Sequence, residues 1–489
     1  MRCTAFLGLL FCIVVGFVAF ANQCEAQDRP NILLLLSDDH SYPYVSAYGD
    51  RNVKTPTLDR LASEGMLCHR FFTSAPQCVP SRAALMTGRS PVASRMTRFS
   101  SPLPADEITL PEILREKANY YTGICGRSFH LDGPGNNKQA EGIGALIEKH
   151  GLKTFAKRVD HLNTCADGLV ASEVEKFLTN KPEGRPFFLW ANFSDPHHVW
   201  NAPAEFRPNP IDLVLPGCWP DLPGMREQFA DYCAEINRLD RTIDGVLKVL
   251  KDKGVFDQTL IVFLGDNGAA LPHGKGSLYD PGSNVPCIVR WPKHVPAGMQ
   301  SHALMSGEDI APTMLAAAGI PTGDRMTGVN LLPVLRGETG KVRDAIYVER
   351  GPHGSAPVTV NMTNSGYDLA RAVRTDHYKL IYNGTPWIPY APVDSAGGPA
   401  WSQIKTAQAD GKLAKKFEAT YFSNPRPVYE LYDLREDPSE LNNRSGDASL
   451  AETETQLRTL LAEKMLLDRD YLPLPDLQVE SKNKSKAKK

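Results

Sequence analysis

The stretch Pro30-Asn31-Ile32-Leu33-Leu34-Leu35-Leu36-Ser37-Asp38-Asp39 is a continuous apolar run that ends in two carboxylates. A strand covered on both faces has this pattern, because neither of its alternating sets of side chains meets water. Further runs of the same kind follow at Tyr120–Cys125, Phe187–Phe193, Leu260–Leu264 and Cys287–Arg290. The sequence therefore predicts a sheet whose central strands are buried on both faces.

Amphipathic stretches lie between these apolar runs. Leu110–Ala118 carries leucines and an isoleucine at helical spacing, and Phe229–Leu250 carries one long apolar stripe. Strands that alternate with helices, from residue 31 to about residue 320, predict a doubly wound α/β fold. We expect a large, mixed, mostly parallel sheet sandwiched by helices.

The last third of the chain has a different pattern. Residues 371–383 and 429–434 alternate like exposed antiparallel strands, and the polar residues 391–414 between them predict a long loop. Residues 450–467 predict a terminal helix, and residues 481–489 contain mainly Lys and Ser. A chain of 489 residues is long enough for two domains. We expect a large α/β domain over residues 27–340, a smaller α+β domain built on an antiparallel sheet over 341–475, and a basic disordered tail over 476–489.

The N-terminus has the features of a signal peptide over residues 1–26. Arg2 is followed by an apolar run from Leu7 to Ala21 and then by small residues suited to cleavage. The run is short for a membrane span, so cleavage is favoured over an anchor, and no second hydrophobic span follows. The sequence therefore predicts a secreted or periplasmic protein without a stable membrane anchor.

Composition and cysteine content limit the possible partners. The formal net charge is −2, with 42 % hydrophobic and 22 % charged residues, so no global field attracts nucleic acid. Seven of the ten cysteines lie beyond the predicted signal peptide, an odd number for an exported protein. If Cys78 serves chemistry, six remain, of which Cys125 and Cys287 lie in apolar strands and can be buried thiols.

Reactive residue types follow four of the predicted strands. Asp38 and Asp39 end the first run, residues 126–130 follow the second, residues 194–198 the third, and Asp266-Asn267 the fourth. Ligands of open α/β sheets bind at the carboxyl ends of the strands, so four such ends indicate one shared site. Each acidic pair alone could be a turn or a helix cap. Together they predict an oxygen-ligand site for a hard cation, Ca²⁺ or Mg²⁺.

Cys78 is predicted to begin a helix. Pro80 suits the first turn, residues 83–86 propagate the helix, and Gly88 can end it. A helix N-terminus favours anions, and Arg82 adds a fixed positive charge one turn along. We expect Arg82 to face a cleft, where its loss would cost activity and little stability. The alternative is a buried structural cysteine beside a surface arginine.

The run from Cys78 to Arg89, CVPSRAALMTGR, resembles the signature of the type I sulfatases, C-x-P-S-R followed by a small-residue helix and T-G-R. The resemblance extends over nearly the whole mature chain and includes the segments at residues 30–39, 55–62, 265–268 and 430–438. The stretch from Asp266 to Pro292, with Asp195-Pro196-His197, is most similar to the heparan N-sulfatase (sulfamidase) branch. The fold implied is that of the alkaline phosphatase superfamily.

The resemblance implies a sulfatase that acts on sulfated carbohydrate, with a role for each matching residue. Cys78 would be oxidised by a formylglycine-generating maturation enzyme to 3-oxoalanine (formylglycine), whose hydrate attacks sulfur and leaves a sulfated enzyme. One Ca²⁺ would be held by residue 78 together with Asp38, Asp39, Asp266 and Asn267. His130 would deprotonate the remaining hydroxyl to release sulfate, and His197 and Lys275 would bind sulfate oxygens and protonate the leaving group.

One position departs from the family pattern. Sulfatases usually carry lysine where this chain has Arg127, in a G-K-x-H or G-K-x-F-H run. The spacing from Gly126 to His130 fits the longer form, which is typical of iduronate-sulfatase-like members. Arginine keeps the positive charge but does not readily give up a proton. Proton donation would then have to come from His197 or Lys275.

Two other functions fit the same residues. A phosphonate or phosphodiester hydrolase of the same superfamily would need a similar charge clamp. A sulfated-glycan-binding protein that has lost catalysis would be consistent with Arg127. The sequence leaves open the sugar, the sulfate position, and whether an O–S or an N–S bond is broken.

Overall fold

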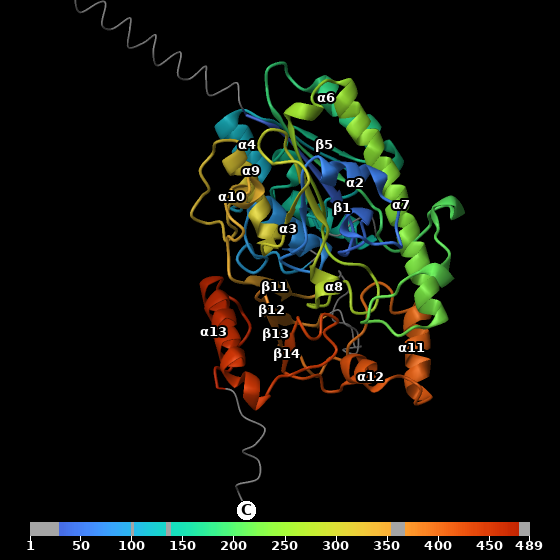
Figure 1. The fold of residues 1–489 in the computed structure, drawn as a ribbon. Coiled ribbons are helices and arrows are strands. Elements are labelled where there is room, and N and C mark those ends of the chain that lie inside the picture. Colours follow the sequence, from blue (N-terminus) through green and yellow to red (C-terminus); the bar gives the residue numbers. More distant parts are fainter. Residues whose placement is uncertain (1–28, 99–101, 134–137, 354–366, 479–489) are drawn as a thin grey trace, which may run out of the picture.

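An eight-stranded mixed sheet forms the centre of the larger part of the protein (Figure 1). This computed structural model describes residues 29–98, 102–133, 138–353 and 367–478. The strands lie in the order β5 (His161–Thr164), β4 (Tyr121–Gly126), β6 (Phe187–Asn192), β1 (Asn31–Ser37), β7 (Thr259–Gly265), β8 (Cys287–Arg290), β2 (Met66–Cys68) and β9 (Met299–Ser301). The first five are parallel, whereas β8 is antiparallel to both of its neighbours. The predicted mostly parallel sheet is confirmed.

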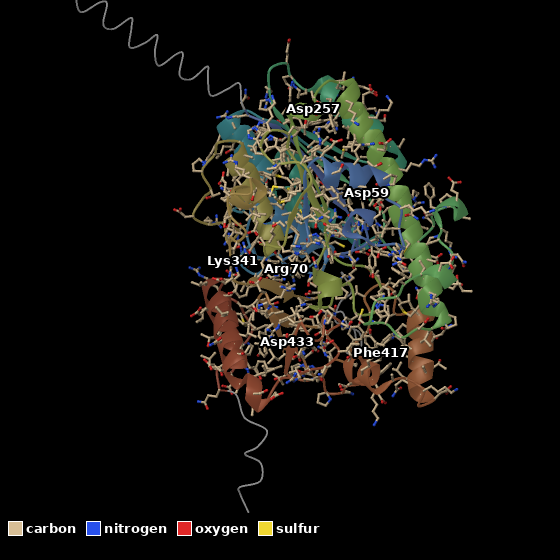
Figure 2. The ribbon with its side chains drawn as sticks, in the orientation of Figure 1. Asp59, Arg70, Asp257, Lys341, Phe417 and Asp433 are labelled. Carbon is tan, nitrogen blue, oxygen red and sulfur yellow. The ribbon has the colours of Figure 1, made fainter. Side chains whose placement is uncertain are left out.

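Helices cover both faces of this sheet, which explains its continuous apolar strands. In β1, Ile32, Leu34 and Leu36 pack into one core cluster, and Leu33 and Leu35 pack into the opposite one. All five side chains are fully buried. The first face is covered by α3 (Cys78–Thr87), α4 (Leu110–Ala118) and α9 (Ile310–Ala317), and the second by α2 (Pro56–Ser63), α6 (Val170–Asn180) and α7 (Pro223–Asp252). Side chains fill the space between these layers, while charged residues such as Asp257 and Lys341 lie exposed at the periphery (Figure 2).

The long helix α7 extends beyond the sheet and corrects one prediction. Its first half packs against α11 (Pro399–Ala409), which contributes the buried side chains of Trp401 and Ile404. Residues 391–414 were expected to form a loop, but α11 lies within them. The local pattern is weak because α11 has few apolar anchors, and the contact with α7 stabilises it.

A second, antiparallel sheet contains β11 (Ile346–Arg350), β12 (Ala370–Arg374), β13 (Tyr378–Asn383) and β14 (Tyr429–Asp433) in that order. These strands are buried, so the expectation of exposed strands was wrong. One face packs on α13 (Ala451–Leu467), and the other packs on Phe72 and Leu278 of the larger part. The polar positions that suggested exposure include Arg371 and Lys379, which are buried in ion pairs. The predicted domain boundary near residue 340 precedes β11 and stays a prediction.

Several other expectations concern single residues. Cys125 and Cys287 are buried free thiols, as expected, and in the part of the chain that the structure describes the remaining cysteines are free as well. Within the described ranges, no helix combines the length and the apolar character that crossing a bilayer requires. The predicted signal peptide and residues 479–489 of the predicted tail lie outside the described residues, whereas residues 476–478 are described and the main-chain oxygens of Asp476 and Gln478 accept from Arg458.

Gly126, at the end of β4, offers a test of the fold. Its φ is +90°, and a Cβ placed on it would lie 2.0 Å from the main-chain oxygen of Asn192 in β6. Because this oxygen belongs to the main chain of the adjacent strand, it cannot move aside as a flexible side chain would. Gly126→Ala should therefore lower the free energy of unfolding by about 3 kcal/mol or more. Denaturant unfolding measures this change. Gly168→Ala is the matched control, since a Cβ there meets nothing within 4 Å; equal losses in the two variants would contradict the account.

Candidate active site

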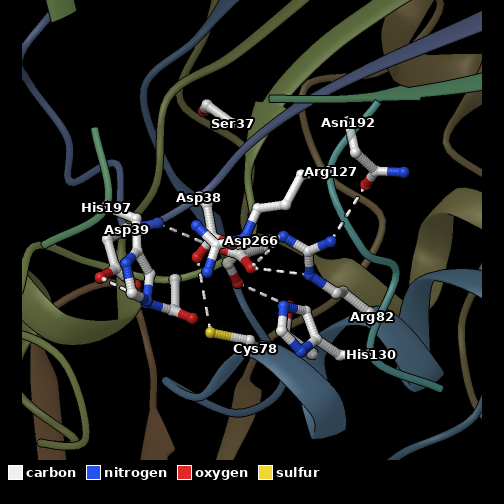
Figure 3. A network of polar contacts seen from close by, with 12 residues as sticks. Ser37, Asp38, Asp39, Cys78, Arg82, Arg127, His130, Asn192, His197 and Asp266 are labelled. Carbon is white, nitrogen blue, oxygen red and sulfur yellow. Dashed lines mark hydrogen bonds and ion pairs between the residues drawn. The ribbon is translucent and has the colours of Figure 1, made fainter. Parts of the chain in front are cut away.

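The carboxyl ends of four adjacent parallel strands, β4, β6, β1 and β7, meet at one place (Figure 3). Asp38 and Asp39 follow β1, Arg127 follows β4, His197 lies beyond β6, and Asp266 follows β7. The structure thus brings together the reactive residues that the sequence placed at separate strand ends. Several surface hollows of the protein lie elsewhere and are lined by other residues, so this site is identified by its chemistry.

Cys78 is the first residue of α3, as predicted, and Gly88 ends the helix with a φ of +66°. The thiol is 2 % exposed and donates to Asp38 Oδ1 across 3.5 Å. Burial and the neighbouring Asp38 carboxylate raise the pKa of Cys78 well above its usual value. Residue 78 therefore lies at a helix N-terminus and beside the acidic end of β1.

Arg82 does not face a cleft; it is fully buried, which corrects the expectation from sequence. Its Nε donates to Asp266 Oδ2 and its Nη2 to Asp38 Oδ2, both across 2.9 Å. Its Nη1 donates to Asn192 Oδ1 across 3.0 Å. The guanidinium therefore holds the acidic ends of β1 and β7 together from inside the protein.

The three carboxylates differ in their charge environments. Burial disfavours ionisation of Asp38, but the Arg127 and Arg82 guanidiniums outweigh it and hold the pKa of Asp38 well below its usual range. Burial raises the pKa of Asp39 to about 7, and burial with the nearby Asp38 charge raises the pKa of Asp266 to about 6. Asp39 and Asp266 thus lack part of the positive charge that would stabilise their ionised forms.

The donor atoms of the site fit a hard cation. Ligand atoms of Asp38, Asp39, Cys78 and His197 lie within 4.8 Å of one another. The Oδ1 of Asn267 is buried and has no hydrogen-bond partner among the described residues, while its Nδ2 donates to Asp39 Oδ1 across 2.8 Å. A buried oxygen without a hydrogen-bond partner, beside three buried carboxylates, is a set of donor atoms that suits a cation of the Ca²⁺ or Mg²⁺ type.

Two basic side chains reach the same carboxylates. Arg127 Nε lies 2.9 Å from Asp38 Oδ2, and its side chain is 18 % exposed. Lys275 Nζ lies 2.8 Å from Asp39 Oδ1 and is almost fully buried. Both therefore place a positive charge at the carboxylates beside Cys78, where a sulfate or a phosphate could be neutralised.

The two predicted histidines have lowered pKa values. Burial and the Arg82 charge lower the pKa of His130 to about 3, and its buried Nε2 has no partner in the described ranges. Burial and the Lys275 charge lower the pKa of His197 to about 4. His197 Nε2 lies 3.8 Å from Asp39 Oδ2. Both imidazoles are therefore neutral near pH 7 and able to accept a proton.

Two residues of the site were missed from the sequence. Asp394 Oδ2 lies 2.7 Å from Lys275 Nζ, and His353 Nε2 lies 3.6 Å from Asp394 Oδ1. Asp394 belongs to the stretch that was expected to be a featureless loop. No local signal marks it, because its partner lies 119 positions earlier in the chain.

The comparisons with known proteins agree with this geometry. The family model "Sulfatase" matches residues 30–320, and the model "N-sulphoglucosamine sulphohydrolase, C-terminal" matches residues 272–386. Human N-sulphoglucosamine sulphohydrolase is 28 % identical over 500 aligned positions, covering 94 % of each chain. The chain belongs to the sulfatase family and is a sulfuric ester hydrolase. Within that family it is a type I sulfatase close to the sulfamidase branch.

Solved structures share the fold. BT4656, determined with its substrate D-glucosamine-2-N,6-O-disulfate, superposes with a TM-score of 0.65 at 20 % identity, covering 91 % of this chain and 99 % of that one. The phosphonate monoester hydrolase of Agrobacterium radiobacter superposes with a TM-score of 0.65 at 22 % identity, covering 90 % and 95 %. The predicted superfamily fold is thus confirmed, and the fold alone does not separate sulfate from phosphonate chemistry.

Arg82→Met tests whether the buried Arg82 guanidinium holds the acidic ends of β1 and β7 together. With the guanidinium gone, Asp38 and Asp266 keep their buried charge without its partner, so the free energy of unfolding should fall by about 3–5 kcal/mol in metal-stripped protein. Denaturant unfolding gives this value. The control is Arg241→Met, whose ion pair with Glu205 is exposed and should contribute less than about 1 kcal/mol. Two equally small losses would show that Arg82 does not hold the strand ends together.

Proposed function

We propose that this protein removes sulfate from a sulfated carbohydrate, from a sulfate ester or an N-sulfate, by means of a formylglycine made from Cys78. The observation that carries the proposal is the position of Cys78: it begins α3 within C-x-P-S-R and contacts the acidic end of β1. The similarity to N-sulphoglucosamine sulphohydrolase over almost the whole chain supports an amino sugar as the substrate.

Two groups would supply the central chemistry. Ca²⁺, held by Asp38, Asp39, Asp266 and Asn267 together with an oxygen of residue 78, would supply positive charge beside the sulfate. The formylglycine would supply an aldehyde hydrate whose oxygen is a nucleophile toward sulfur. A maturation enzyme would make it from Cys78, and the predicted N-terminal signal peptide would direct export.

The remaining side chains would hold the sulfate and move protons. Arg127 uses its Nε on Asp38 and its Nη1 donates to Ser194 O, so its Nη2 would contact the sulfate oxygens. Because an arginine does not give up its proton, the leaving group would take its proton from Lys275 or His197. His130, whose Nε2 is without a partner in the described chain, would accept the proton from residue 78 when sulfate leaves.

The state of residue 78 is directly measurable. Peptide mass spectrometry of active protein from its native host should show the Cys78 peptide with the thiol replaced by an aldehyde. Cys78→Ala should lose turnover by several orders of magnitude while remaining folded. An unmodified thiol in fully active protein would contradict the formylglycine mechanism.

A phosphonate or phosphodiester hydrolase is the second candidate, because that chemistry occurs on the same fold. Turnover of 4-nitrophenyl sulfate and of bis(4-nitrophenyl) phosphate distinguishes the two, since both release the same alcohol. We expect kcat/KM to favour the sulfate by about 10²-fold or more, the discrimination that a site built for one anion's charge and hydrogen bonding can supply. A preference for the phosphodiester would replace the proposed function with the second candidate.

A further inference from the structure

Lys275 lies between two carboxylates that come from distant parts of the chain. On the inner side, its Nζ is 2.8 Å from Oδ1 and 3.1 Å from Oδ2 of Asp39, which follows β1. On the outer side, it is 2.7 Å from Oδ2 of Asp394. The Lys275 side chain is 1 % exposed and that of Asp394 is 32 % exposed. Asp394 therefore binds the ammonium from the open side of the site.

Asp394 is itself tied to the residue that precedes the nucleophile. His353 Nε2 lies 3.6 Å from Asp394 Oδ1, and His353 Nδ1 lies 3.2 Å from Nε2 of Gln77. The Gln77 side chain also exchanges hydrogen bonds with the backbone of Gly351, since its Nε2 donates to the oxygen and its Oε1 accepts from the N–H. A continuous polar chain thus connects the start of α3 to Lys275.

The backbone around Lys275 is held in the same way. Gly276 has a φ of +76°, and its N–H donates to Pro76 O across 2.8 Å. A Cβ on Gly276 would lie 2.4 Å from Val393, so the segment that carries Asp394 lies directly on this glycine. The Lys275 loop is therefore held between the residues before Cys78 and the segment at residues 393–395.

We propose that Asp394 is the positioning residue of Lys275 and holds its Nζ where it can donate to the leaving-group atom. A lysine has a flexible four-carbon stem, so its partners determine where the ammonium lies. With Asp39 as its only partner, Nζ would move inward toward the metal ligands. Asp394 draws Nζ outward, toward the open side of the site. This proposal rests on the proposed function, in which Lys275 protonates the leaving group.

Asp394→Asn tests the proposal through leaving groups of different basicity. A sugar alkoxide or amine needs a proton to depart, whereas 4-nitrophenolate does not. The variant should therefore lose about 10²-fold in kcat on a sulfated sugar such as glucosamine 6-sulfate or N-sulfoglucosamine, whichever the wild-type enzyme turns over. It should lose less than about 3-fold on 4-nitrophenyl sulfate, with little change in KM for either substrate. Asp394→Glu should recover part of the lost rate, and Asp410→Asn, in the exposed Lys412–Asp410 pair, is the control for the same chemical change.

A double-mutant cycle with Lys275→Met tests whether Asp394 acts through Lys275. If Asp394 acts only through Lys275, Asp394→Asn should have no further effect on kcat once Lys275 is Met. A crystal structure of Asp394→Asn provides a readout apart from activity, with Nζ expected on Asp39 alone. Equal losses on both substrates, an undiminished loss in the Lys275→Met background, or an unmoved Nζ would each overturn the proposal. Failure of the wild-type enzyme to cleave any sulfate would instead contradict the proposed function.

Discussion

The buried guanidinium of Arg82 is the interaction on which the site depends. Parallel strands deliver Asp38 and Asp266 to the same edge of the sheet, where they are fully buried close to each other. Like charges in a low-dielectric environment repel, and burial alone disfavours their ionised forms. Arg82 contacts both carboxylates through separate nitrogens, and α3 carries it together with Cys78. The same helix thus holds the acidic strand ends together and places Cys78 beside them.

Carboxylates outnumber cationic side chains around Arg82. Four carboxylates face three cationic side chains, and the set consists of Asp38, Asp39, Asp266, Asp394, Arg82, Arg127 and Lys275. Two of the cations converge on Asp38, whereas burial, together with the nearby Asp38 charge, raises the pKa values of Asp39 and Asp266. The unsatisfied Oδ1 of Asn267 lies in the same cluster. A divalent cation at this point would offset the carboxylate charge, and it would also give Asn267 Oδ1 a partner.

Much of the catalytic part could be predicted from the sequence, because its signals are local. The continuous apolar strands follow from burial on both faces, and the helix at Cys78 follows from Pro80 and Gly88. The strand ends predicted a shared site because topology alone brings such ends together. Features that depend on contacts between distant parts of the chain were either missed or predicted wrongly. Arg82 was expected in a cleft because its buried partners follow other strands, and α11 was missed because α7 stabilises it.

In the C-terminal part, distant contacts also made the prediction from sequence wrong. Its strands looked exposed because charged residues alternate with apolar ones, yet those charges are buried in ion pairs with partners such as Asp470 and Asp280. Asp394 carried no signal, although it is bound to Lys275 in the site. In both cases the polar residue is explained by a partner that periodicity does not reveal.

Calorimetric titration of Ca²⁺ into metal-stripped protein tests most directly whether the strand ends held by Arg82 form a site for one divalent cation. We expect one ion bound per chain, with binding weakened by at least about 10-fold in Asn267→Ala, which removes the buried Oδ1. The absence of Ca²⁺ binding, or an affinity unchanged by Asn267→Ala, would contradict this expectation.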